Sequence, residues 1–174
     1  MPRFRVLQVY DSIAEAIVHM DHTHHKVHEQ KYFAQCDEVQ DIASGNHQYY
    51  LIKPDAPLHL HYAISSSGAI ISRLYENPNT SLDGTGLIPR NLNRAFGTDD
   101  PATIIYKSPT VVDPGTILCA ELSGGTGVGN TQQSAVGDMG VIEWILSASD
   151  TYLIDVESKG TDVDIVSSIA YYRR

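Results

Sequence analysis

The stretch Leu58–Ser66, which reads LHLHYAISS, is the part of the sequence that most directly predicts the fold. Apolar residues at positions 58, 60, 62 and 64 alternate with His59, His61 and Ala63, which is the two-residue period of a strand with one buried face. The stretch Ala69–Glu76 follows across a Ser-Ser-Ser-Gly sequence. We therefore expect these two stretches to form a β-hairpin.

Other short stretches of the chain are also apolar or alternating. They are Tyr49–Ile52, Ile104–Tyr106, Ile117–Leu122, Val141–Leu146, Tyr152–Val156 and Val163–Tyr172. In the last one, positions 163, 165, 167, 169 and 171 share one face. Trp144 is expected to belong to the core. About eight or nine short strands with almost no helix predict an all-β domain, either a β-sandwich or a jelly roll.

The N-terminal residues 1–29 are predicted to form an arm, attached to a β-sandwich domain of residues 30–174. Helix signals occur at Ser12–Met20, since Ser12 can cap a helix that has Glu15 three residues later. An extended arm fits the same stretch, because its apolar pattern is short. The segment is polar and rich in histidine, so we expect it to dock on a neighbouring subunit rather than to fold alone.

Composition excludes several classes of protein. The chain has 174 residues, 42% of them hydrophobic, which suits a single globular domain with its own core. A net charge of −9 argues against a nucleic-acid partner. We expect neither a membrane span nor a signal peptide, hence synthesis in a reducing cytoplasm. Cys36 and Cys119 are then expected to be buried, reduced thiols.

Two segments, 77–100 and 123–140, are predicted to be long loops, which are natural contact elements in a protein that binds a surface. The second contains GGTGVG at 124–129. This run lacks the Lys-Ser/Thr of a phosphate-binding loop and is not followed by an apolar helix. We interpret it as a surface loop.

Histidine is the residue type that most suggests chemistry. His59 and His61 lie on one face of a strand and are weak candidates for metal ligands, as in a cupin-like enzyme. However, no glutamate follows within a few residues, and the sequence has no histidine after His61. The sequence also lacks a GxSxG nucleophile motif. We therefore expect no metal, no cofactor and no catalytic residue.

Several motifs resemble a group of small virion proteins of tailed bacteriophages. The resemblance covers the chain from about residue 24 onwards. It is carried by His24–Phe33 (HHKVHEQKYF), Gly84–Leu87 (GTGL), Asn91–Arg94 (NLNR), Glu143–Leu146 (EWIL), Thr151–Ile154 (TYLI) and the closing Tyr171-Tyr172. The family pattern has a glycine after its third histidine, where this chain has Glu29 and Gln30. The turn after His28 is the point at which the chain departs from the family.

The resemblance implies a β-sandwich that forms part of a virion and catalyses nothing. A capsid decoration (cement) protein would sit on the outer surface of the capsid and bind the major capsid protein. Its motif residues give our candidate interface set: His24, His25, His28, Asn91, Asn93 and Arg94. Asn91 and Asn93 are expected to satisfy loop backbone in Asx turns, and Arg94 to brace carbonyls or a carboxylate.

Tyrosine is unusually frequent, with ten residues. Tyrosine is enriched at protein–protein interfaces, and local three-fold axes of a capsid favour cyclic trimers, so we expect a homotrimer. The alternative function is a tail or head-fibre module that binds host carbohydrate. That alternative predicts exposed aromatic residues in the loops, and the two long loops contain only Phe96. A cupin-like metal-dependent enzyme is the third hypothesis.

Overall fold

Residues 7–11, 16–20, 26–95, 98–99, 104–123, 134–136 and 143–173 are described in a computed structural model, with 7–11, 16–20, 104 and 134–136 described by backbone alone. The regular structure is almost entirely β, with one short helical turn at 26–28. Among the described helices, none has the length and hydrophobicity needed to span a membrane.

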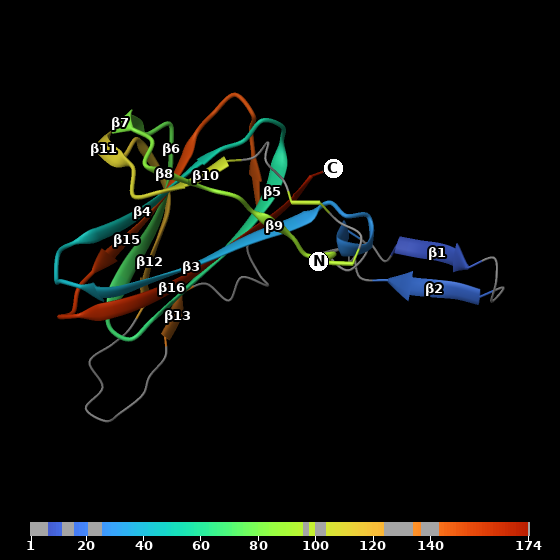
Figure 1. Cartoon of the computed structure of the whole chain (residues 1–174), viewed down its shortest axis with the longest axis horizontal. Coiled ribbons are helices and arrows are strands. Elements are labelled where there is room, and N and C mark those ends of the chain that lie inside the picture. The colour runs from blue at the N-terminus through green and yellow to red at the C-terminus, as the bar shows by residue number, and fades with distance from the viewer. Residues whose placement is uncertain are drawn as a thin grey trace.

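Two six-stranded sheets form the body of the molecule (Figure 1). The first, which we call the β15 sheet, has the order β12 (Thr116–Ser123), β6 (Ile70–Glu76), β15 (Tyr152–Ser158), β4 (His47–Lys53), β10 (Ile104–Lys107) and β8 (Thr85–Leu87). The second, the β16 sheet, has the order β13 (Ser134–Val136), β5 (Leu58–Ser66), β16 (Val163–Arg173), β3 (Tyr32–Ile42) and β9 (Arg90–Asn91), and β14 (Trp144–Leu146) also pairs with β5. Every strand pair in both sheets is antiparallel.

One apolar core lies between the two sheets, because the inward faces of their strands belong to a single buried cluster. The predicted alternation is confirmed: positions 58, 60, 62 and 64 of β5 and 163, 165, 167, 169 and 171 of β16 are all buried. Trp144 packs partly buried against this cluster. The predicted all-β sandwich is therefore confirmed, whereas the jelly-roll variant stays a prediction.

A polar bridge also joins the two sheets. Asp37 on β3 lies 2.8 Å from the Lys107 ammonium group on β10, and the Tyr50 hydroxyl on β4 donates a 2.8 Å hydrogen bond to the same carboxylate. Burial raises the pKa of Tyr50, so the phenol keeps its proton for this hydrogen bond.

The expected hairpin between Leu58–Ser66 and Ala69–Glu76 is wrong, although both strands exist. β5 belongs to the β16 sheet and β6 to the β15 sheet, so the Ser-Ser-Ser-Gly sequence carries the chain across the sandwich. Within it the Ser66 hydroxyl donates to the Gly68 carbonyl, and the Ser67 N–H donates to Asp164 of β16. Both strands have an apolar side, and because they lie in opposite sheets, both apolar sides are buried in the core between the sheets.

The expected helix at 12–20 is wrong for its second half. Ala16–Met20 is strand β2, which pairs with β1 (Leu7–Asp11) in a separate two-stranded antiparallel sheet, and 12–15 lie outside the described residues. Figure 1 shows this hairpin to one side of the two large sheets. The stretch AIVHM is β-branched at two of its five positions, which suits a strand.

The segments expected to be structureless loops contain strands. Within 77–100 lie β7 (Asn79–Leu82), β8 and β9, and β7 pairs with β11 (Thr110–Asp113) in a small sheet at one end. Gly84 turns the chain between β7 and β8 at a φ of 89°, where an added Cβ would come within 2.3 Å of the Lys107 carbonyl oxygen. Of 123–140, Ser123 ends β12 and 134–136 form β13, while 124–133 and 137–140 lie outside the described residues.

The expectation of two buried thiols is wrong for Cys36. Its side chain is exposed on β3, whereas Cys119 is partly buried against the core. The two positions differ because Cys36 lies on the outer face of β3, whereas Cys119 on β12 packs against the core.

Candidate functional site

The chain makes a helical turn just before β3. The Gln30 N–H donates to the Val27 carbonyl and the Lys31 N–H to the Lys26 carbonyl, both at 3.0 Å, which closes a helical turn. Gln30 takes a left-handed φ of 61°. A left-handed residue at the end of a helical turn is usually glycine, and this chain has glutamine at that position.

We predict that Gln30→Gly stabilises the protein by about 0.5 kcal/mol, since relief of left-handed strain slightly exceeds the entropic cost of glycine. Gln40→Gly is the matched control, because Gln40 is an exposed residue of β3 without a positive φ. That control should lose stability. Urea denaturation measures both variants, and equal losses in the two would contradict the prediction.

Asn91 fixes this turn to the rest of the molecule. Its side chain is 1% exposed, and its amide nitrogen donates to the carbonyls of Gln30 at 2.9 Å and Thr98 at 3.1 Å. Its amide oxygen accepts the Asn93 N–H at 2.8 Å, which is the Asx turn predicted for this motif. Asn91 therefore ties the N-terminal turn, β9 and the loop that follows β9 into one unit.

Asp99 completes this unit with two arginines. Its carboxylate contacts the guanidinium groups of Arg90 at 2.6 Å and Arg94 at 2.7 Å, and it accepts the Asn91 backbone N–H at 3.1 Å. The hydrogen bonds from Arg90 and from the Asn91 backbone lower the pKa of Asp99 to about 2. Arg94 thus braces a carboxylate, which is one of the two structural roles predicted for it. Its side chain remains 64% exposed.

The two candidate metal ligands meet an acid from a distant part of the chain. Glu143 precedes β14, which pairs with β5 so that Ile145 lies opposite His59. The Glu143 carboxylate lies 2.8 Å from His59 Nδ1 and 3.6 Å from His61 Nε2. The acid that the sequence lacks near His61 is therefore supplied by Glu143 through the pairing of β14 with β5.

Aromatic rings cover the same cluster. Tyr172 donates its hydroxyl to Glu143 and stacks on His59 with ring centroids 4.5 Å apart, and Tyr32 stacks on the other side of Tyr172 at 5.8 Å. His59 is 6% exposed and Tyr172 4% exposed, although both belong to the outer face of the β16 sheet. Among the described residues no group of three His, Cys, Asp or Glu side chains has a geometry suited to a metal ion. What the arrangement does is fasten β14 to the outer face.

We predict a pH dependence of stability from Glu143. Burial raises the pKa of Glu143, but the hydrogen bonds from Tyr172 and His59 and the charges of His59 and His61 outweigh it, so the pKa lies below its ordinary 4.5. A lowered carboxyl pKa gives stability that is present above about pH 4.5 and is lost as the pH falls further. Because Glu143 is 40% exposed, the contribution at neutral pH should be below about 1 kcal/mol.

The measurement is the free energy of unfolding of wild type and Glu143→Gln from pH 7 to pH 3. The deficit of the variant should shrink below pH 4.5, where wild-type Glu143 also becomes neutral. Glu38→Gln, an exposed change on β3, serves as the control. A deficit of Glu143→Gln that is constant across this range would contradict the role assigned to its charge.

The described candidate residues lie at one end of the sandwich. The Leu92 N–H donates to the Tyr32 carbonyl, and the Tyr32 ring centroid is 6.5 Å from that of His61, so the NLNR loop and the histidine cluster both contact Tyr32 at the start of β3. His28 is exposed in the turn that Asn91 holds. His24 and His25 lie outside the described residues. This region consists of Lys26–Lys31, the loop after β9 and the His59 cluster. We call it the clamp end.

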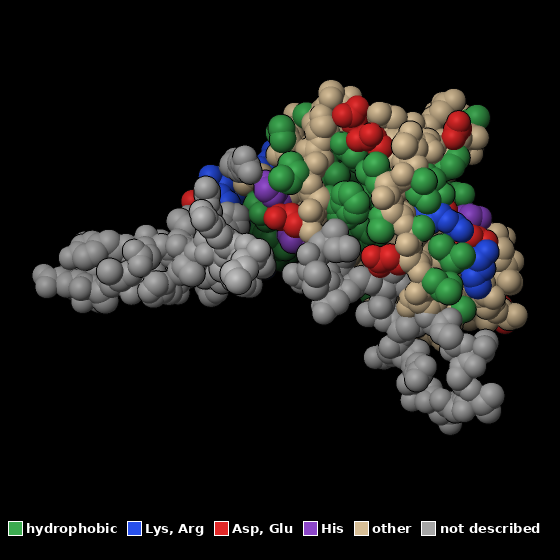
Figure 2. All heavy atoms as spheres, turned by 180° about the vertical axis from the view of Figure 1, so that it is seen from behind, with side chains coloured by type: hydrophobic (Ala, Val, Ile, Leu, Met, Phe, Trp, Pro, Cys, Tyr) green, Lys and Arg blue, Asp and Glu red, His purple; other side chains and the backbone are tan. Residues whose placement is uncertain are grey.

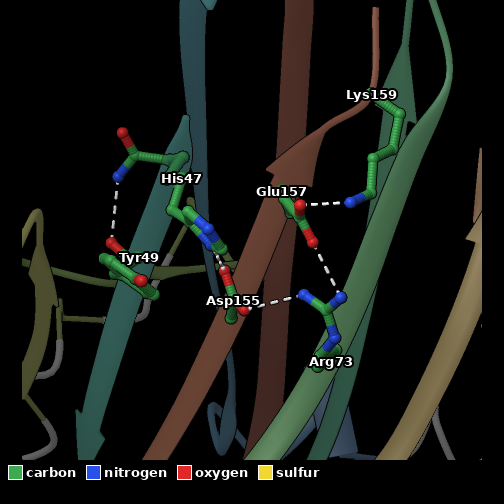
Figure 3. A network of polar contacts seen from close by, with 7 residues as sticks. His47, Tyr49, Arg73, Asp155, Glu157 and Lys159 are labelled. Atoms are coloured by element: carbon green, nitrogen blue, oxygen red, sulfur yellow. Dashed lines mark hydrogen bonds and ion pairs between the residues drawn. The ribbon is translucent and has the colours of Figure 1, made fainter. Parts of the chain in front are cut away.

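A second polar network, which the sequence did not reveal, lies on the outer face of the β15 sheet (Figure 3). Asp155 is 3% exposed and accepts from Arg73 at 3.1 Å and from His47 at 2.7 Å. The other nitrogen of Arg73 contacts Glu157 at 2.7 Å, and Lys159 contacts Glu157 as well. Hydrogen bonds from Lys159 and Arg73 lower the pKa of Glu157 to about 2.

No protein-family model matches the chain, and a search of curated proteins finds no significant match.

Proposed function

We propose that this protein is a non-enzymatic structural component of a tailed-phage virion, a decoration protein that binds the major capsid protein on the outer surface of the head. The observation that carries the proposal is the clamp end. Several motifs that resemble the phage family lie there in part, namely 26–33, Asn91–Arg94, Glu143 and Tyr172, and their polar atoms hold backbone and strands in place. Asn91 ties three segments together, and Asp99 is committed to Arg90 and Arg94.

The proposal also fits what a cement protein must do. A ligand that binds only the assembled shell stabilises it by mass action, by about 2.7 kcal/mol per site when the free protein is at 100 times its Kd. A sandwich with one core and a polar bridge between its sheets resists deformation when it is bound to the shell. The exposed guanidinium groups of Arg90 and Arg94 lie at the clamp end and can reach a neighbouring acidic surface.

The test is cosedimentation of the purified chain with empty, expanded capsids and, separately, with purified tails of the same phage. Saturable binding to capsids, with a single class of site, is the expected result. Arg94→Ala should weaken it, whereas Lys159→Ala, an equally simple charge removal far from the clamp end, should not. Binding to tails with none to capsids would overturn the assignment.

A second candidate function is a tail or head-fibre module that binds host carbohydrate. The observation in its favour is on the outer face of the β15 sheet, where Tyr49, Tyr75 and Tyr106 are half-buried. Tyr49 lies opposite Asp155, and Tyr75 and Tyr106 lie on the strands beside β15 and β4. Sugars are bound by aromatic faces together with carboxylates and guanidinium groups. Binding to tails and to a glycan array, lost in Tyr75→Ala, would support this candidate instead.

A further inference from the structure

Strand β3 has an edge that is only partly paired. One edge pairs with β16 along nearly its whole length, but the other pairs with β9 at Phe33 and Ala34 alone. From Gln35 to Gln40 that second edge has no strand partner within the described part of the chain. An unpaired strand edge offers a row of backbone donors and acceptors to another strand.

A groove of about 620 Å³ lies beside this free edge. The groove is lined by Ala34–Cys36 of β3 together with Gly86–Ile88, Arg90 and Leu92. Ile88 is 56% and Leu92 42% exposed, so apolar surface faces solvent next to unpaired backbone. Figure 2 likewise shows apolar side chains reaching the surface of the molecule in several places. Backbone edge plus apolar groove is the arrangement that accepts an added β-strand.

The chain also carries a strand pair that needs such a partner. β1 and β2 pair with each other, in the register Leu7↔Met20 and Val9↔Val18, and belong to neither large sheet. Strand alternation places these four apolar positions on one face of the hairpin. A two-stranded hairpin alone is at best marginally stable in water, and a third strand with a cover for its apolar face stabilises it.

We propose that β1 of a second copy of this chain pairs with the free edge of β3, so that the apolar face of the arm covers the groove. Charge favours this occupant: Arg3 and Arg5 precede β1, and Glu38 and Asp41 are exposed on β3. The five residues of β1 are one fewer than the six of the free edge, Gln35–Gln40. Each copy gives one arm and receives one, and this head-to-tail exchange can close into a ring of three.

This inference goes beyond the proposed function, since it concerns self-association of the chain without any capsid. Its failure is distinguishable from failure of the proposed function because cosedimentation with capsids is a separate measurement. An arm that bound only the body of its own chain would leave the protein monomeric, and light scattering distinguishes this outcome from exchange between copies.

The first experiment is light scattering of the full-length protein at micromolar concentration. Wild type should be a multiple of 19.1 kDa, whereas Ile88→Asp/Leu92→Asp and a chain lacking residues 1–20 should run as monomers with an unchanged β spectrum. Leu82→Asp is the matched control, because Leu82 is 68% exposed on β7, and it should remain oligomeric. A monomeric wild type, or an oligomer that survives the groove variant, would overturn the proposal.

The second experiment uses Cys36, the exposed thiol in the groove wall. A tagged Val9→Cys/Cys36→Ser/Cys119→Ser chain is mixed with an untagged Cys119→Ser chain and oxidised, so that a disulfide between a tagged and an untagged chain can form only between positions 9 and 36. A crosslinked pair of twice 19.1 kDa is expected, and it should disappear when the untagged chain carries Cys36→Ser. Absence of the pair, or its persistence without Cys36, would contradict the proposal even if the groove variant failed to fold.

Discussion

Asn91→Ala is expected to destabilise the protein by about 3 kcal/mol, because it removes three hydrogen bonds made by a buried side chain, each worth about 1 kcal/mol. The substitution removes the partner of the Gln30 and Thr98 carbonyls and of the Asn93 N–H. Besides this loss of overall stability, the turn at 26–31 should detach from β9, since the Asn91 side chain holds the two together. Urea denaturation gives the stability, and hydrogen exchange at Gln30 and Lys31 shows the detachment.

Asn91→Asp makes the prediction sharper. The variant keeps the shape and the acceptor for Asn93, but it replaces the amide donor by an oxygen that faces two carbonyls and lies near Asp99. It should be at least as destabilising as alanine at pH 7. Asn79→Ala, an exposed asparagine on β7, should change stability by no more than about 0.5 kcal/mol. Comparable losses in Asn91→Ala and Asn79→Ala would show that Asn91 holds nothing together.

Asp155→Ala should cost about 2–3 kcal/mol, near the lower end of the range for breaking a buried ion pair. The side chain of Asp155 is 5% exposed, and its carboxylate contacts both Arg73 and His47. Its removal leaves the largely buried Arg73 with Glu157 as its remaining acid in this network. The cost falls at the lower end because the Arg73 side chain is 20% exposed and keeps that second contact.

The matched control is Asp164→Ala, an exposed aspartate on β16 that accepts one backbone N–H. Its loss should stay below about 1 kcal/mol. In the double variant Arg73→Leu/Asp155→Leu the loss should be smaller than in Asp155→Ala, since no charge is then stranded. Thermal and urea denaturation measure all three, and equal effects of Asp155→Ala and Asp164→Ala would mean that the network contributes little.

The sequence predicted the strands that form the core, because a two-residue apolar period is a local signal. β5 matches its predicted bounds, Leu58–Ser66, and β16 differs by one residue. Strand β3 was missed, since YFAQCDEVQDI buries few of its residues and its alternation is mostly polar. The hairpin between β5 and β6 was wrong because a short polar connection suits a hairpin and a crossing between sheets equally well.

The candidate site shows the same limit. Asn91, Asn93 and Arg94 were found because their motif is contiguous, and the Asx turn follows from local chemistry. Glu143 lies 84 residues from His59 and reaches it only through the pairing of β14 with β5. Asp155 and Arg73 likewise meet across paired strands. Contacts of this kind depend on strand order, which the sequence pattern does not specify.

The most direct test of the proposed role compares phage particles that carry this protein with otherwise identical, fully expanded particles that lack it. Both are heated, and release of DNA is followed with an intercalating dye. If the protein is a cement protein, undecorated particles release DNA at a lower temperature, and adding back the purified chain restores the wild-type release temperature. Release at the same temperature in decorated and undecorated particles would contradict the account.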